Sequence, residues 1–116
     1  MITRKPAVDR ETLKLIKQAV LEEAEKQGVK VERVILFGSR ARGDYREDSD
    51  YDILVIVKGE LDRTSRRKLA RRIRLRLLEE LNAPADIIIT TTTKWKTYQD
   101  EIGHLYYDAK REGILA

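Results

Sequence analysis

The sequence predicts a mixed α+β fold, in which a small mixed β-sheet has helices packed on one face. Two observations support this class. Segments with helical periodicity alternate along the chain with short apolar runs of strand length, which is typical of helices that cover a sheet. The 116 residues are enough for one hydrophobic core and too few for two generous ones. We therefore expect a single domain over residues 1–116.

Composition narrows the classes of protein further. Charged residues make up 38% of the chain, the net charge is +4 and the pI is about 9.4, a mildly basic balance that suits a nucleotide, an acidic partner or RNA. No apolar run is long enough to span a bilayer, and no leading segment resembles a secretion signal, so we expect no membrane association. The absence of cysteine excludes disulfides and fits a cytoplasmic protein.

The first helix is predicted over residues 9–27, where apolar side chains recur at helical spacing. Asp9 is placed to cap its N-terminus, and Gly28 stands where a helix-ending glycine is expected. Residues 1–8 have the pattern of a short tail. This helix is expected to serve as scaffold.

Two apolar strands flank the most informative segment of the chain. The first is predicted at Val31–Phe37, and the second ends near the turn at Lys58-Gly59. The second strand opens with Asp50 and Asp52. Side chains two residues apart leave the same face of a strand, so these two carboxylates are expected to point together, about 6 to 7 Å apart along the strand.

A cation between Asp50 and Asp52 would relieve their repulsion. Magnesium is the natural candidate, because it is a hard ion that prefers oxygen ligands and shares them with substrate phosphates. A turn residue of this type is often purely structural, but a plain strand has no reason to carry two charges where it enters the core. The Asp-x-Asp pair therefore favours a site.

The turn before this strand offers groups that suit a phosphate. Gly38 allows a tight turn and close approach of a ligand, and Ser39 adds a hydroxyl at the start of a short helix expected near residues 39–42. Three nearby arginines, whose planar guanidinium groups match phosphate geometry, are Arg40, Arg42 and Arg46.

A basic helix is predicted next, capped by Asp62 or Ser65 and ending before Asn82-Ala83-Pro84. Its apolar row at i+4 spacing consists of Leu69, Ile73, Leu77 and Leu81. Its other faces carry Arg63, Arg66, Arg67, Lys68, Arg71, Arg72, Arg74 and Arg76. These cations form a solvated helix face, or else a docking surface for an acidic partner or for RNA.

A short strand, residues 86–90, follows and opens with the carboxylate of Asp86. One of the threonines at 91–93 is expected to cap a last helix that continues past Ala109. Its apolar stripe is predicted to be core or a subunit interface: Trp95, Tyr98, Ile102, Leu105 and Ala109. His104, the sole histidine, lies off that stripe and is expected at the surface.

The motifs together resemble a known family. Gly38-Ser39, ten further residues and then Asp50-Tyr51-Asp52 are similar to the signature of the polymerase β-like nucleotidyltransferases. More narrowly, GSRARG followed by SDYD resembles the minimal nucleotidyltransferases, or MNT domains, many of which pair with HEPN-domain toxins. The likeness runs through most of the chain and implies the polymerase β-like nucleotidyltransferase fold.

The resemblance also implies a set of site residues. Asp50, Asp52 and Asp86 would be the catalytic carboxylates and the ligands of two Mg²⁺ ions, although Asp86 also fits a strand-end turn. Nucleotide contacts are implied for Gly38, Ser39, Arg40, Arg42 and Ser49. Within that set, Ser39 and Arg42 would hold the β- and γ-phosphates, with Arg40 assisting.

The implied activity is transfer of AMP from ATP to a tyrosine of a HEPN ribonuclease toxin by a protein adenylyltransferase that acts as its antitoxin. We expect the acceptor on another chain, because this one leaves no room for an acceptor domain. One alternative is a non-catalytic module that neutralises its partner by contact. Another is a nucleotidyltransferase that modifies RNA or a small molecule and uses the basic helix to hold it. Homo-oligomerisation is compatible with the sequence, and nucleic-acid binding is not favoured.

Overall fold

The computed structural model describes residues 8–116, so the predicted tail, apart from Val8, lies outside the described residues. The elements follow in the order α1 Arg10–Lys26, β1 Val31–Phe37, α2 Ser39–Arg42, β2 Tyr51–Val57, α3 Arg63–Leu81, β3 Ala85–Thr91, α4 Thr92–Tyr98, α5 Leu105–Glu112 and β4 Ile114–Leu115. The predicted α+β class is confirmed. Within the described residues, no helix combines the length and apolar character that a membrane crossing needs.

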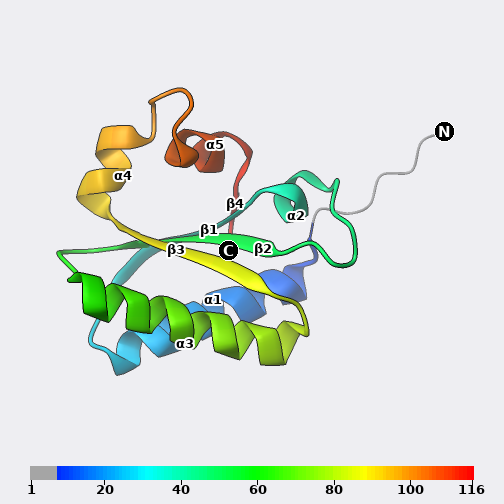
Figure 1. Cartoon of the computed structure of the whole chain (residues 1–116), viewed down its shortest axis with the longest axis horizontal. Coiled ribbons are helices and arrows are strands. Elements are labelled where there is room, and N and C mark those ends of the chain that lie inside the picture. Colours follow the sequence, from blue (N-terminus) through cyan, green and yellow to red (C-terminus); the bar gives the residue numbers. More distant parts are fainter. Residues whose placement is uncertain (1–7) are drawn as a thin grey trace.

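The sheet has four strands in the order β3-β2-β1-β4. β1 runs antiparallel to both β2 and β4, while β2 and β3 are parallel, as expected for strands joined through the α3 crossover. The sheet is therefore mixed, as the sequence predicts. α1 and α3 lie together on one of its faces (Figure 1).

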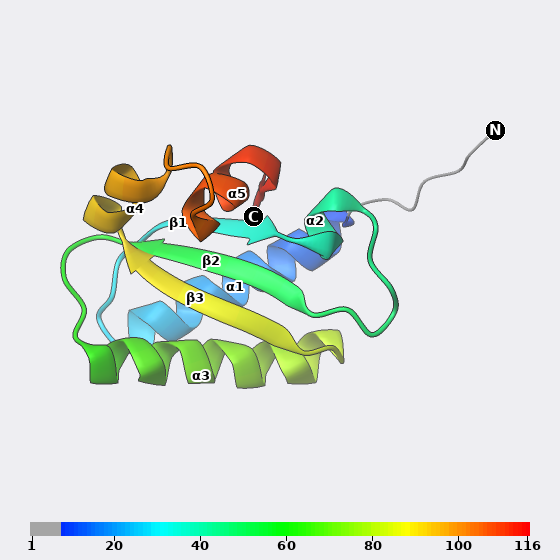
Figure 2. The same ribbon diagram turned by 45° about the horizontal axis from the view of Figure 1, so that its top comes forward.

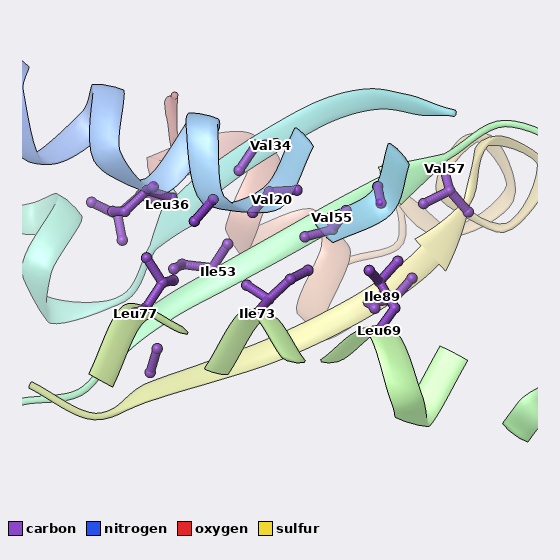
Figure 3. Packing of buried hydrophobic residues seen from close by; sticks show 14 of the residues in the cluster. Val20, Val34, Leu36, Ile53, Val55, Val57, Leu69, Ile73, Leu77 and Ile89 are labelled. Atoms are coloured by element: carbon purple, nitrogen blue, oxygen red, sulfur yellow. The ribbon is translucent and has the colours of Figure 1, made fainter. Parts of the chain in front are cut away.

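The main core fills the space between the sheet and these two long helices. Figure 3 shows side chains from α3 and β2 interleaved in this layer. The predicted α3 row is buried through Leu69, Ile73 and Leu77, each 0% exposed, and they meet Ile53 and Val55 of β2 in the same cluster. Burial of this apolar stripe is what fixes α3 against the sheet.

Capping side chains fix where the helices begin. Asp9 accepts a hydrogen bond from the Thr12 N–H at 2.7 Å, which confirms the predicted α1 cap. Of the two candidates for α3, Asp62 is the cap and accepts from the Ser65 N–H at 2.7 Å. Thr91 caps α4. Each cap satisfies a backbone donor that the first helical turn would otherwise leave unpaired.

The last helix differs from its prediction. The segment forms two short helices, α4 and α5, which cover part of the second sheet face (Figure 2). The helical run is interrupted by a turn that contains Gly103, whose φ is +91°. His104 then caps α5, because its side chain accepts a hydrogen bond from the Tyr106 N–H. The predicted stripe is therefore interrupted. Trp95 is buried, but Ile102 in the connecting turn is 82% exposed.

An ion-pair network joins α1 to α3. The Arg76 guanidinium donates to Glu22, Glu23 and Glu80 at 2.9 to 3.1 Å. Glu23 is buried, and despite the opposing effect of that burial, hydrogen bonds from Lys26 and Arg76 hold the pKa of its carboxyl below its usual range. Within residues 8–116, the other α3 cations make no ion pair.

Replacing Arg76 by Met is expected to destabilise the protein by about 1 to 2 kcal/mol at neutral pH. A carboxyl whose pKa is lower in the folded state adds stability above its ordinary pKa of about 4.3, and this is lost as the pH falls through the folded-state pKa. The difference in unfolding free energy between the two proteins should therefore shrink as the pH falls below about 4. Urea denaturation of both proteins at several pH values measures this difference in unfolding free energy. A difference that is constant with pH would contradict this account.

Candidate active site

The parallel register of β2 and β3 places Asp52 directly beside Asp86. Side chains alternate along these strands. Leu54 and Ile56 of β2 and Ile88 of β3 belong to the cluster under α4 and α5, so Asp52 and Asp86 leave that same sheet face. The two carboxylates that the sequence separates by more than thirty positions are therefore neighbours on one face. α1 and α3 cover the opposite face.

Asp50 precedes β2 and, like Asp86, is exposed, whereas Asp52 is half-buried. Burial, together with the negative charges of Asp86 and Asp50, raises the pKa of the Asp52 carboxyl, while Arg42 opposes that rise. The charges of Asp50 and Asp86 thus both act on Asp52. Asp50 and Asp86 are open to solvent.

This donor set fits a divalent cation. Carboxylate oxygens are the ligands that Mg²⁺ prefers, and a cation would offset the repulsion that acts on Asp52. No group of three His, Cys, Asp or Glu side chains in the described part of the chain is gathered tightly enough to form a ready-made metal site. Binding of one ion by Asp50, Asp52 and Asp86 together would therefore require their side chains to turn toward it.

Gly38 brings the turn after β1 against Asp52. Its φ is +74°, and a Cβ built on it would lie 2.2 Å from the Asp52 Oδ2 atom. Only glycine allows both this backbone conformation and this approach. The Gly38 carbonyl accepts from the N–H groups of Ala41 and Arg42, which starts α2. The turn predicted to bind phosphate therefore lies next to Asp52, one of the predicted carboxylates.

Arg40 points away from solvent into its own loop. It is 8% exposed, donates through Nε and Nη2 to the carbonyls of Ser49 and Glu47, and lies over the rings of Tyr45 and Tyr51 at 4.4 and 4.5 Å. These contacts give Arg40 a structural role in the loop, and its nucleotide contact stays a prediction. The sequence motif alone does not distinguish an arginine that turns inward from one that turns outward.

Ser49 is likewise occupied within this loop. Its hydroxyl accepts from the Arg46 N–H at 2.8 Å, and its N–H donates to the Arg46 carbonyl. The predicted nucleotide contact of Ser49 has no support in these bonds. Arg46 itself is exposed. Arg40 and Ser49 together shape the loop that leads into Asp50.

Replacing Arg40 by Lys is expected to cost about 1 to 2 kcal/mol of stability and to loosen residues 43–50, because lysine cannot reproduce the forked hydrogen bonds and the stacking. Amide hydrogen exchange of this loop measures the effect. The matched control is Arg46→Lys, an exposed arginine of the same loop, which should leave exchange unchanged. Equal exchange rates in the two variants would contradict the proposal that Arg40 holds this loop in place.

Arg42 remains at the surface of the site, with 45% of its side chain exposed. Its Nη1 donates to Glu112 Oε1 at 3.0 Å, and its Nε donates to Asp44 Oδ2 at 3.3 Å. Glu112 Oε1 also accepts from the Gly38 N–H at 3.2 Å. Glu112 was missed by the sequence argument, since nothing in its local pattern marks a residue of α5 as a neighbour of the Gly38 turn.

Comparison with known proteins agrees with this arrangement. The profile of a family described as the nucleotidyltransferase domain matches residues 13–114. Two proteins of Methanocaldococcus jannaschii, both named as candidate protein adenylyltransferases, are 69% identical over 29 residues and 47% identical over 49 residues. These matches cover 25% and 42% of this chain and span only 29% and 47% of the relatives' own lengths.

Solved structures share the fold. A candidate nucleotidyltransferase from Sulfolobus solfataricus is 30% identical, with a TM-score of 0.57, over 90% of this chain and 78% of that chain. A structure described as a candidate minimal nucleotidyltransferase is 31% identical, with a TM-score of 0.57, over 92% of this chain and 95% of that chain.

Two more distant structures are toxin–antitoxin complexes. One contains AMP-PNP and matches at 21% identity and a TM-score of 0.58, covering 85% of this chain and 70% of that chain. The other holds a tri-AMPylated Shewanella oneidensis HEPN toxin with an MNT antitoxin. It matches at 18% identity and a TM-score of 0.51, over 89% of this chain and 70% of that chain. At these identities the likeness concerns the fold.

Proposed function

This chain belongs to the nucleotidyltransferase domain family, and on that premise we propose that it transfers AMP from ATP to a tyrosine of a HEPN-domain toxin and so acts as an antitoxin. The observation that carries the proposal is the meeting of Asp52, Asp86 and the Gly38 turn at one end of the sheet. Relatives named as protein adenylyltransferases support the reaction, and the fold shared with toxin–antitoxin complexes supports the partner.

The Gly38 turn is proposed to hold the triphosphate. The Gly38 N–H, the Ser39 hydroxyl and the Arg42 guanidinium are the donors assigned to it, because backbone amides and arginine side chains suit phosphate oxygens. Arg42 is exposed enough to reach a ligand. Holding the triphosphate here would place its α-phosphate beside the carboxylates, which reduces the entropy cost of the reaction.

Asp50, Asp52 and Asp86 are proposed to hold two Mg²⁺ ions, which when bound would lower the pKa of the attacking hydroxyl and offset charge on the leaving pyrophosphate. Asp86, exposed at the start of β3, is assigned to accept the proton of the acceptor tyrosine. The tyrosine oxygen then forms a bond to the α-phosphorus as the bond from that phosphorus to the bridging oxygen of the β-phosphate breaks. AMP remains on the partner, and pyrophosphate leaves.

The position of α3 bears on the RNA alternative. The helix carries eight basic and two acidic residues, so it is net +6, while the rest of the chain is net −2. It covers the sheet face opposite Asp52 and Asp86. RNA held along its solvent-exposed side would not lie over the carboxylates, which argues against α3 as the acceptor-binding surface of this site.

The proposal is tested by incubating the protein with ATP, Mg²⁺ and its co-purified HEPN partner. Mass spectrometry should locate AMP on a tyrosine of the partner, and the ribonuclease activity of the modified partner should fall. Loss of ribonuclease activity on mixing without ATP would favour the non-catalytic alternative. AMP found on RNA instead of on the partner protein would overturn the assigned acceptor.

A further inference from the structure

An acidic side chain lies in the turn assigned to the phosphates. Glu112, the last residue of α5, is 74 positions from Gly38, yet its Oε1 atom accepts both from the Gly38 N–H at 3.2 Å and from Arg42 Nη1 at 3.0 Å. A backbone N–H and a guanidinium are the groups that bind a phosphate oxygen. The Glu112 carboxylate therefore offers an anionic oxygen to the same two donors.

Packing at the end of α5 holds the backbone of Glu112 close to this turn. A Cβ on the next residue, Gly113, would lie 2.2 Å from the Ala109 carbonyl oxygen and 2.3 Å from Ile35 Cγ2, so the end of α5 rests closely on β1. Ala109 is buried in the cluster that contains Ile35. Only 27% of the Glu112 side chain is exposed. The Glu112 side chain thus reaches the turn from a backbone position that is packed on β1.

The contact places like charges together. Glu112 is close enough to Asp52 for their negative charges to interact unfavourably, and Arg42 offsets part of this repulsion. Arg42 is also engaged on its other side by Asp44. In this arrangement Glu112 and Asp44 both accept hydrogen bonds from Arg42, which a triphosphate would need. Glu112 also accepts from the Gly38 N–H.

We propose that Glu112 is a resident anion that competes with the triphosphate for Gly38 and Arg42 and is displaced when ATP binds. The inference rests on the proposed function, because it assumes that this turn holds the phosphates. It predicts that removing the charge of Glu112 strengthens nucleotide binding. A residue that merely positioned Arg42 for the phosphates would have the opposite effect when removed.

The test is isothermal titration of ATP, and separately of inorganic triphosphate, into the wild-type protein, Glu112→Gln and Glu112→Ala. Both variants are expected to bind both ligands about three- to tenfold more tightly, since a charge-assisted competitor has been removed. Thermal unfolding establishes that each variant is folded. In NMR spectra without ligand, the Gly38 amide signal should shift in Glu112→Ala and move again when ATP is added.

Two matched controls separate the contributions. Asp44→Asn removes the other carboxylate at Arg42 but makes no contact with Gly38, so its gain in affinity should be smaller. Glu79→Gln removes an exposed carboxylate of α3, on the opposite layer, and should change nothing. Unchanged or weaker binding in both Glu112 variants, with ATP still bound by wild type, would overturn this inference alone. If the wild-type protein binds neither ATP nor triphosphate, both the proposed function and the inference about Glu112 fail.

Discussion

Replacing Asp52 by Asn is expected to slow AMP transfer by about 10³-fold or more, because the change removes a central charge from the groups that would hold the metal and the reacting phosphate. Asp52 has Asp86 as its register neighbour and Gly38 packed against it. The rate of AMP incorporation into the partner, at saturating ATP, measures the effect.

The same change should not weaken the fold. Burial and neighbouring charges raise the pKa of the Asp52 carboxyl, so its ionised form costs stability at neutral pH, and a neutral Asn removes that cost. Thermal unfolding in the presence of a chelator should give Asp52→Asn a midpoint at or above that of wild type. Loss of activity then cannot be attributed to unfolding.

The matched control for Asp52 is Asp48→Asn, an exposed carboxylate in the preceding loop. It makes the same chemical change without touching the site and should transfer AMP at the wild-type rate. Equal rates for Asp52→Asn and Asp48→Asn would refute the catalytic assignment.

Replacing Gly38 by Ala is expected to destabilise the protein by about 2 to 4 kcal/mol and to abolish ATP binding. The added Cβ would meet Asp52 Oδ2 at 2.2 Å, and alanine is strained at a φ of +74° with a ψ of −159°, a combination essentially restricted to glycine. Urea denaturation measures the first effect and isothermal titration with ATP the second.

Gly59 supplies the comparison of a glycine that also has a positive φ but is not crowded. Its φ of +77° is nearly that of Gly38, but a Cβ there would meet nothing within 4 Å. Gly59→Ala should therefore cost only about 1 kcal/mol and leave ATP binding intact. A loss of stability and binding equal to that of Gly38→Ala would show that the close approach to Asp52 is unimportant.

Local patterns predicted the elements of this fold well. The Asp9 cap, the α3 row and the strand at 31–37 follow from short-range interactions, because a carboxylate satisfies nearby N–H groups and apolar spacing decides which face is buried. The second strand was predicted to open at Asp50 and begins at Tyr51, and Asp62 was one of two candidates for the α3 cap. Asp50 and Asp52 were proposed as site residues on a similarly local pattern, two charges at the start of a strand that enters the core. Asp86 was proposed as the third carboxylate only with the help of the family resemblance.

Long-range packing decided what could not be predicted. Arg40 belongs to the same motif as Arg42, yet it turns inward because Tyr45, Tyr51 and two loop carbonyls surround it. Glu112 reaches the turn only because α5 packs on β1. The break at Gly103 splits an otherwise continuous helical stripe, and a positive φ there is required by the turn rather than by the periodicity.

The central claim is that this site transfers AMP, and ATP labelled at the α-phosphate or at the γ-phosphate tests it most directly. The wild-type protein, with its HEPN partner and Mg²⁺, should place the α-label on the partner and leave the γ-label in released pyrophosphate. Asp52→Asn should place neither on it. The γ-label on the partner, no α-label with wild type, or equal α-label with Asp52→Asn would contradict the account.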